Sequence, residues 1–366
     1  MALTRIPAPA IADVREPNFR NIIINGDMAV SQRGTAFTSN GYTLDRFTMD
    51  ESTDGAVTVT QDTDVPAGSG FASSLKVDCT TADASIGAAQ YCIFTTKFEG
   101  QNLQYLKYGT SSAQSLTLSF WVKSVKTGTY CISFVKEAGG ETRYECPIEY
   151  TISSASTWEK KTIILTPTAG STTFIQNSAG AIVDSNASGF RVIFTLAAGS
   201  DFHATNNTWV AGSDKMSTSN QVNFLDNTSN NFWLTGVQLE AGSVATDFEV
   251  VPYSQNLERC KRYFEICGAA FTGGTSTTTN VDGSLQYSVN KRSDTGQSYS
   301  LERTTSALAN PGIAGINAAA IAAVDSRRTN VGAYLSITVG ATTADRKVST
   351  YYQNWLKVDD ELWLVQ

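Results

Sequence analysis

Apolar and polar residues alternate along the segment SLTLSFWVKS, residues 115–124. Leu116, Leu118, Phe120 and Val122 occupy every second position, and Ser, Thr, Trp and Lys fill the positions around them. Because successive side chains of a strand point to opposite faces of a sheet, this pattern predicts a strand with one face in a hydrophobic core. The other face is expected to meet solvent or a partner.

Short runs rich in β-branched and aromatic residues recur from Asn21 onward, separated by Gly, Ser, Thr, Asn and Asp. Nine of these runs are predicted as strands: 21–24, 56–61, 74–79, 90–98, 115–124, 129–137, 159–166, 189–196 and 231–240. Regular strands with turn signals between them, and no long helical periods, predict an all-β fold. Its first part is expected to be an antiparallel β-sandwich of the jelly-roll type.

The pattern changes after Tyr253. Apolar residues then recur at close to helical spacing and Gly268 follows, which predicts one short helix. These positions are Leu257, Cys260, Tyr263, Phe264 and Cys267. Strand-like runs return in LQYSVNK, GAYLSITVG and VSTYYQNWLKV, so a small β-rich C-terminal domain is predicted.

Three parts are therefore expected: an N-terminal strap at 1–20, a jelly-roll domain at 21–253, and a short helix plus a small β-rich domain at 254–366. The strap contains three prolines and little periodicity, so it is either a disordered tail or a docking strap. The segment 232–265 is interpreted as the joint between the two domains. In this interpretation Pro252 fixes an ordered loop between the last jelly-roll strand and the helix.

Charge and cysteine content narrow the classes of partner. The formal net charge of −7 would repel a phosphate backbone, so nucleic acid is not an expected partner. No stretch is apolar enough to span a bilayer or to form the core of a secretory signal, so neither membrane insertion nor secretion is expected. The six cysteines form no C-x-x-C pair and are expected to be reduced thiols.

Signs of catalysis are few. His203 is the single histidine, and an ordinary loop residue is the favoured interpretation of it. No nucleophile elbow, phosphate loop or H-E-x-x-H pair occurs. Two carboxylates would suffice to hydrolyse a glycan, and the densest acidic cluster is Asp359, Asp360 and Glu361. Neighbouring residues in a strand point in different directions, so a solvated edge is favoured and no enzymatic activity is predicted.

A structural calcium site is the one cofactor considered. Asn25 and Asp27, in the sequence NGDMAV, offer oxygen ligands that a second strand could complete. The alternative is a turn made by Asn25 and Gly26, a dipeptide that favours turns by itself.

Several motifs together resemble a recurring module of bacteriophage tail-fibre and other virion-surface proteins. They are NIIINGDMAVSQRG, GYTLDRF, FEGQNLQYLKYGTSSAQSLTLSFWVKSVKTGTYCISF, YTISSASTWEKKTIIL and the joint segment 232–265. The first domain is also similar to the galactose-binding-like jelly roll of carbohydrate-binding modules. Met28 stands where the family usually has Phe, Lys261 where it more often has Gln, and the Pro expected after Lys291-Arg292 is absent.

The resemblance implies a non-enzymatic virion structural protein, in the first place a homotrimeric tail fibre or fibre tip that binds host cell-surface glycans. A capsid decoration or head-fibre protein is the alternative, and a tail-associated glycanase is the third reading. Its place would be the virion surface, after synthesis in the host bacterial cytoplasm. The strap would attach to other virion proteins, with Pro7, Pro9, Pro17 and Phe19 as the candidate contacts.

Exposed aromatic rings are the expected sugar contacts, because their faces stack on the apolar face of a sugar ring. The candidates are Trp121, Trp158, Trp209, Trp233 and Trp355. For each of them the alternative is a place in the hydrophobic core, where sandwich tryptophans are more often found.

Overall fold

The computed structural model describes residues 20–137, 143–168, 174–211, 214–267, 272–275, 280–293, 298–301, 307–310, 313–324, 332–339, 347–349 and 356–359. The strap candidates Pro7, Pro9, Pro17 and Phe19 lie outside these residues, as do Trp355, Asp360 and Glu361. Within the described part, no helix is long and apolar enough to cross a membrane.

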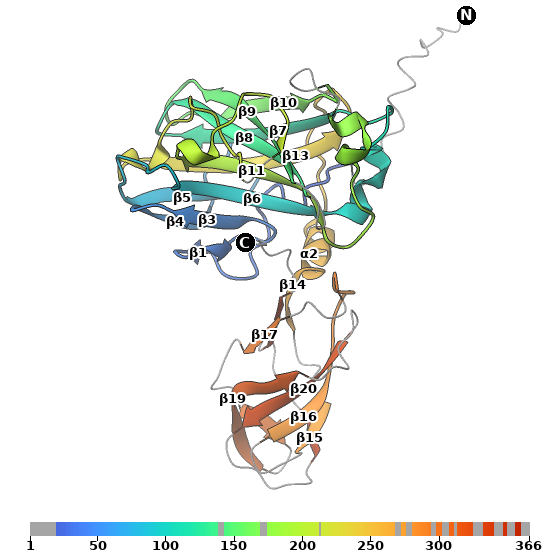
Figure 1. Cartoon of the computed structure of the whole chain (residues 1–366). Helices are drawn as coiled ribbons and strands as arrows, with labels where there is room; N and C mark the ends of the chain where they lie inside the picture. The colour runs from blue at the N-terminus through green and yellow to red at the C-terminus, as the bar shows by residue number, and fades with distance from the viewer. Residues whose placement is uncertain are drawn as a thin grey trace, which may run out of the picture.

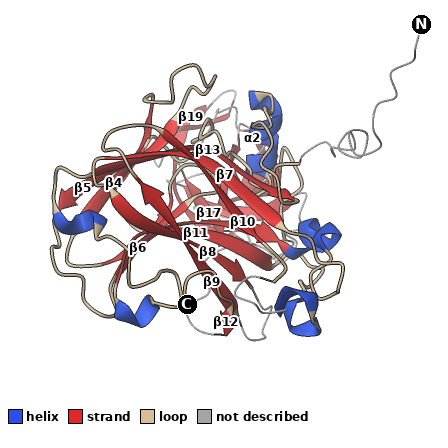
Figure 2. Cartoon of the chain, turned by 90° about the horizontal axis from the view of Figure 1, so that it is seen from above, coloured by secondary structure: helices blue, strands red, loops and turns tan. Residues whose placement is uncertain are grey.

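Two antiparallel sheets pack face to face and form the upper part of the molecule, which confirms the predicted all-β sandwich (Figures 1 and 2). Sheet A contains, in spatial order, β1 (Ala36–Phe37), β4 (Ala56–Asp62), β5 (Ser74–Thr81), β13 (Asn231–Ala241), β7 (Leu116–Ser124) and β10 (Glu159–Leu165). Sheet B contains β12 (Val210–Ala211), β9 (Tyr144–Ile152), β8 (Gly128–Lys136), β11 (Ser188–Ala198), β6 (Tyr91–Glu99), β3 (Thr48–Ser52) and β2 (Gly41–Tyr42).

Aromatic side chains from both sheets fill the space between them. Phe120 of β7 and Phe194 of β11 are fully buried and meet edge to face, with ring centres 5.4 Å apart. Burial of one such side chain contributes about 1.5–3 kcal/mol, so this layer holds the two sheets together. The alternation along β7 thus places its apolar residues in the core, as its sequence predicts.

The predicted strand at 21–24 is wrong, although the segment does lie beside a strand. It runs along the second half of β13, where β5 has ended, and Ile22 N donates to Leu239 O at 2.8 Å. The side chain of Asn21 takes the place of further ladder bonds: its Oδ1 accepts from Leu239 N and its Nδ2 donates to Val237 O. These side-chain bonds produce a turn in place of a regular strand.

A helix and a second β-rich unit follow the sandwich and lie below it in Figure 1. The predicted helix is α2 (Tyr253–Lys261), but it ends before Gly268 because residues Phe264–Cys267 form β14 and pair with β22 (Leu356–Asp359). β17 (Ser298–Leu301) completes this three-stranded sheet. The other sheet contains β18 (Ala307–Asn310), β19 (Ile313–Val324), β20 (Gly332–Val339), β16 (Asn280–Gln286), β15 (Thr272–Thr275) and β21 (Lys347–Ser349).

Candidate functional site

The part of the joint segment between β13 and α2, residues 242–252, folds back over the outer face of sheet A. Gln238 and Glu240 are buried polar residues at the end of that strand. Gln238 Oε1 accepts from Glu249 N at 2.7 Å, and Glu240 Oε2 accepts from the Thr246 hydroxyl at 2.7 Å. These two side chains, and not Pro252 alone, fix the path of the loop.

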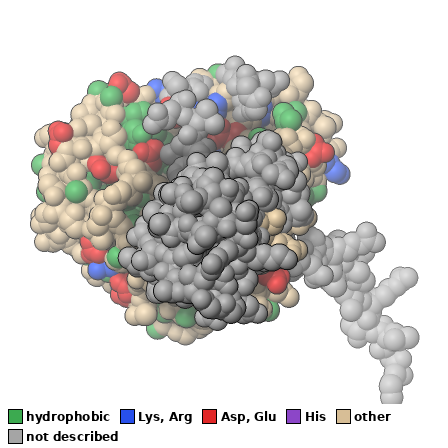
Figure 3. Space-filling view, turned by 90° about the horizontal axis from the view of Figure 1, so that it is seen from below, with side chains coloured by type: hydrophobic (Ala, Val, Ile, Leu, Met, Phe, Trp, Pro, Cys, Tyr) green, Lys and Arg blue, Asp and Glu red, His purple; other side chains and the backbone are tan. Residues whose placement is uncertain are grey.

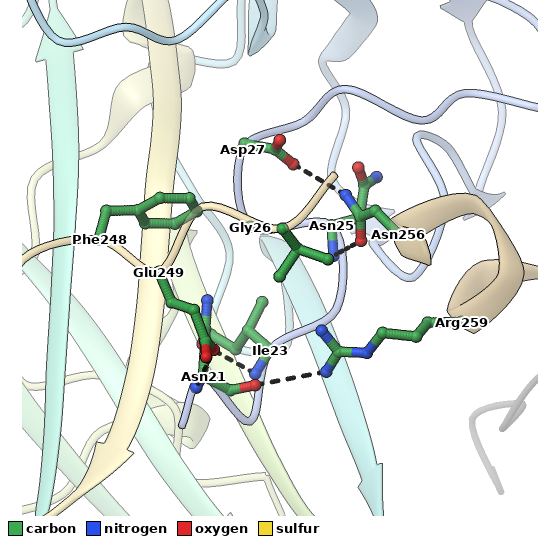
Figure 4. Close-up of a pocket in the computed structure, with 10 residues that line it drawn as sticks. Asn21, Ile23, Asn25, Gly26, Asp27, Phe248, Glu249, Asn256 and Arg259 are labelled. Atoms are coloured by element: carbon green, nitrogen blue, oxygen red, sulfur yellow. Dashed lines mark hydrogen bonds between the residues drawn. The ribbon is translucent and has the colours of Figure 1, made fainter. Parts of the chain in front are cut away.

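Both ends of the jelly roll meet at this loop, as Figure 4 shows. The two carboxylate oxygens of Glu249 accept from Arg20 N at 3.1 Å and Asn21 N at 2.8 Å. From α2, Arg259 donates to Asn21 O at 3.4 Å. The pocket between these groups measures about 10 Å³, which is room for a single water molecule. It is therefore a structural joint and too small for a sugar.

The same region contains the candidate calcium ligands. Asn25 Nδ2 donates to Val30 O and Asp45 O, and Asn25 Oδ1 accepts from Val30 N. Asp27 accepts from Asn256 Nδ2 at 3.1 Å, and burial raises the pKa of this aspartate. Asn25 adopts a positive φ of 63° in the turn, as the alternative interpretation expects. Among the described residues, no group of three His, Cys, Asp or Glu side chains could hold a metal ion.

Glu99, at the end of β6, connects the sandwich to the start of the second unit. This fully buried carboxylate accepts from Arg262 Nε and Nη2, both at 2.8 Å, and from the Tyr263 hydroxyl at 2.6 Å. The Arg46 guanidinium lies 3.5 Å from the centre of the Tyr263 ring. Charged hydrogen bonds around one acid thus form one part of the contact between the two parts of the chain, and Gln32 adds another by donating to Phe264 O at 2.8 Å.

Three of the five candidate tryptophans lie together on the outer face of sheet A, on the part that residues 242–252 leave uncovered. Trp233 of β13 is the direct partner of Lys76 on β5 and of Lys123 on β7. Trp158 stands immediately before β10, next to the pairing of Glu159 with Val122, so it neighbours Lys123. Lysine and tryptophan therefore alternate in one row across the sheet. All three tryptophans are half-buried.

Charges and indole rings contact each other along this row. The Lys123 ammonium lies 4.0 Å from the centre of the Trp233 ring and 5.4 Å from that of Trp158. Lys76 lies 5.4 Å from the ring of Trp233. Such cation–π contacts attract each ring to the neighbouring ammonium group. Trp233 has an ammonium contact from each neighbouring strand, whereas Trp158 has one and stands at the edge strand.

Aspartates complete the row. Trp158 Nε1 donates to Asp64 Oδ1 at 3.0 Å, and Trp233 Nε1 donates to Asp62 Oδ2 at 3.4 Å. Asp64 also forms an ion pair with Lys123. Burial acts to raise the pKa of Asp64, but the hydrogen bonds from Lys123 and Trp158 outweigh it and lower this pKa below its ordinary value.

Trp121 lies in the next row, opposite Thr235. A bulge in β13 follows this pair, and its Gly236 has a φ of +59°. A Cβ at Gly236 would lie 2.6 Å from the Phe71 ring, so only glycine lets that ring approach the sheet. Phe71 in turn meets Phe248 of the joint segment edge to face, with ring centres 5.0 Å apart. These two rings form one side of the surface.

We name this surface the tryptophan face. Its members are Trp121, Trp158, Trp233, Lys76, Lys123, Asp62 and Asp64. The lysines and aspartates were not predicted. Period-two spacing does place Trp121 and Lys123 on one side of β7, but the pairing of β7 with β13 cannot be read from either strand alone.

The prediction for Trp209 is wrong, because this residue is only 6% exposed and belongs to the hydrophobic core. Its ring packs on Phe174, with centres 5.2 Å apart. Trp355 lies outside the described residues.

On the outer face of sheet B, the chain that follows β11 takes the place that the tryptophan row has on sheet A. Met216, from the chain after β11, packs on Ile93, Val135 and Ile193, and Thr195 Oγ1 donates to Met216 O at 2.7 Å. Beside this cluster Lys97 is 5% exposed, and burial lowers the pKa of its ammonium group to about 7. His203 lies on the same covering segment, with Nε2 3.1 Å from Ala198 O, as an ordinary loop histidine would.

No protein-family model and no curated protein matches the chain. Among solved structures, it is similar to the enzymatically active domain of a tailspike protein from bacteriophage CBA120, with 14% identity and a TM-score of 0.33. That match covers 61% of this chain and 22% of the tailspike chain, so it concerns a minor part of the phage protein.

Carbohydrate-binding modules are also similar to this chain. A family 11 module from Clostridium thermocellum, in complex with a β-1,3-1,4-mixed-linked tetrasaccharide, has 12% identity and a TM-score of 0.30 over 58% of this chain and 98% of the module. A CBM22-1 xylan-binding domain from Paenibacillus barcinonensis has 10% identity and a TM-score of 0.29 over 62% of this chain and 96% of the domain. Likeness at this level assigns no ligand to this chain.

Proposed function

We propose that this chain is a non-enzymatic virion-surface protein, a tail fibre or fibre tip, that binds host cell-surface glycans through the tryptophan face. The observation that carries the proposal is the row in which Trp158 and Trp233 alternate with Lys76 and Lys123. Such a set of side chains suits a sugar. Indole rings stack on its apolar face, and carboxylates and ammonium groups form hydrogen bonds with its hydroxyls.

Trp158 is the ring that we assign to stacking. Trp233 has ammonium groups from both neighbouring strands, so a sugar would first have to displace a lysine from it. Trp158 has an ammonium contact from Lys123, and among the described residues no strand of sheet A follows β10 on its other side. Its hydrogen bond to Asp64 holds the indole in place before a ligand arrives, which reduces the entropy lost on binding.

The virion context of the proposal is supported by the resemblance of the sequence motifs to phage virion-surface modules. In that context the strap attaches the protein to other virion proteins, and three copies share one axis. Several weak glycan sites on one particle bind a cell surface far more tightly than one site does. Light scattering of the full chain at micromolar concentration tests the trimer, and a monomer mass would contradict it.

Binding to host surface polysaccharide tests the proposed function. Trp158→Ala is expected to weaken binding of the purified protein about tenfold or more, in line with the 1–3 kcal/mol of a stacked ring. Tyr105→Ala is the matched control, because Tyr105 is a 47%-exposed aromatic residue on the 3₁₀ helix Gly100–Leu106, which follows β6 of sheet B. Equal binding by both variants and the unchanged protein would contradict glycan binding at this face.

The absence of turnover is tested in the same mixture. The length of the polysaccharide chains is expected to stay constant while the protein remains bound. Shortened chains would instead favour the tail-associated glycanase.

A further inference from the structure

A polar pocket of about 390 Å³ lies at one end of sheet A. Its walls are Val125, Lys126 and Thr127, between β7 and β8, and Asp226, Asn227 and Asn230, at and after the short 3₁₀ helix Phe224–Asp226. The pocket is shallow and largely open to solvent, and its volume reaches the range of small-molecule sites, about 300–1,000 Å³. Neither the joint nor the tryptophan face uses these residues.

Backbone hydrogen bonds connect the pocket to the tryptophan face. Val125 N donates to Asn231 O at 2.9 Å, and Asn231 stands two residues before Trp233 on β13. Ser156 N donates to Ser124 O at 2.7 Å, which brings the turn before Trp158 to the same end of β7. A ligand that lies on Trp158 can therefore continue toward the pocket.

The polar groups of the pocket are arranged as hydrogen-bond donors and acceptors with little net charge. Lys126 and Asp226 form an ion pair. Asn230 Nδ2 donates to Phe224 O and to Asp226 Oδ1, both at 2.8 Å, so Oδ1 of Asn230 is the atom left to accept from a ligand. Asn227 Oδ1 accepts from Ser229 N, so its amide nitrogen is left to donate.

We propose that this pocket is a second subsite, which binds one uncharged sugar unit of the glycan that stacks on Trp158. The inference rests on the proposed function. A sugar hydroxyl both donates and accepts, and the pocket offers Asn227 to donate and Asn230 to accept.

Pairing of charges selects an uncharged ligand. Lys76 pairs with Asp78 at 2.8 Å, Lys123 pairs with Asp64, and Lys126 pairs with Asp226. A carboxylate or phosphate on the glycan would have to compete with an aspartate for each of these three lysines. The net charge of −7 adds long-range repulsion of an acidic polymer.

The test begins with a panel of neutral and acidic bacterial polysaccharides, from which the one that the full chain binds is selected. Neutral oligosaccharides of increasing length are then prepared from it and used to test the subsite. Asn227→Ala is expected to weaken binding of the longer oligosaccharides about three- to tenfold, the value of one hydrogen bond. Short oligosaccharides that cover only Trp158 should bind unchanged. Thr127→Val, which removes an exposed hydroxyl from the pocket wall, should act in the same direction.

Asn206→Ala is the matched control. Asn206 is an exposed asparagine whose Oδ1 accepts one backbone N–H, from Glu149 at 3.0 Å, just as Asn227 accepts from Ser229 at 2.8 Å. Equal affinities of Asn227→Ala, Thr127→Val and Asn206→Ala for long oligosaccharides would overturn the subsite. Preference for acidic polysaccharides, with an affinity that falls as salt is added, would overturn the uncharged ligand. Neither outcome contradicts the proposed function, which fails separately if Trp158→Ala leaves binding unchanged.

Discussion

The ammonium nitrogen of Lys123 lies 4.0 Å from the centre of the Trp233 ring, and the two residues are direct partners across β7 and β13. Lys123 is only 7% exposed, although it belongs to the outer face of the sheet. Its alkyl chain therefore covers the sheet while its charge is shared between Asp64 and the ring. At this position the polar side of β7 is covered by neighbouring side chains, those of Trp233, Trp158 and Asp64.

Lys123→Met tests this arrangement. We expect the variant to lose about 1 kcal/mol of folding free energy, because it loses the cation–π contact and a partly exposed ion pair while the alkyl packing remains. Urea denaturation measures the loss. Lys160→Met, at an exposed position opposite Trp121 on the same face, should change stability by less than about 0.5 kcal/mol. Equal losses in both variants would show that the ring contact contributes nothing.

Acid is expected to affect the tryptophan face only at low pH. The pKa of Asp64 in the folded protein is below its ordinary value of 3.8. The stability that this carboxylate contributes is therefore fully present above pH 3.8 and is lost as the pH falls through the lower, folded value. Tryptophan fluorescence should stay constant from neutral pH to about pH 4 and change below it. Asp64→Asn should remove that acid transition, and a transition near neutral pH would contradict the assignment.

Lys97 is expected to contribute stability that grows from neutral to alkaline pH. Burial lowers its pKa from 10.5 to about 7, so between these values the unfolded chain binds more protons than the folded protein. This one group should then add to the free energy of unfolding as the pH rises, by at most about 1.4 kcal/mol per pH unit. Buried thiols such as Cys131 and Cys146, whose pKa burial raises, act in the opposite direction near pH 9, so the test compares slopes. Lys97→Met should lower the slope of the free energy of unfolding between pH 7 and pH 9, as measured by urea denaturation. An unchanged slope in the variant would contradict the prediction.

Glu99→Gln is expected to weaken the connection between the sandwich and the unit that follows it. The neutral amide cannot pair with Arg262 as the carboxylate does, so we expect a loss of about 2 kcal/mol. Trypsin should then cut more rapidly next to Lys261 or Arg262, since this connection opens more often. Glu258→Gln, at an exposed position on α2, is the control and should be cut at the unchanged rate.

Much of the sandwich could be predicted from the sequence, because alternation within one strand reports which side faces the core. The strand at 21–24 was mispredicted for a local reason: Asn21 supplies side-chain hydrogen bonds where a strand would use its backbone. β9 was not predicted, since Pro147 and two glutamates interrupt its apolar run, although it pairs with β8 along its whole length.

The tryptophan face could be predicted only in part. Aromatic residues can be recognised in a sequence as candidate sugar contacts. Their partners Lys76, Asp62 and Asp64 cannot, because they come from other strands and from a loop. Only the register between strands brings these residues together. The core position of Trp209 likewise depends on Phe174, which precedes it by 35 positions in the sequence.

The hydrogen bonds from the backbone of residues 20 and 21 to Glu249 determine how force would pass through the protein. Residues 20 and 21 are tied by hydrogen bonds to Glu249, just before α2, and to Arg259, on α2 itself. Tension between the N-terminal arm and the C-terminal unit would therefore be carried across a few hydrogen bonds at one corner of the sandwich. Of the strands that bear the tryptophan face, β13 also bonds to residues 21 and 22 through Val237 and Leu239, so its second half would share this load.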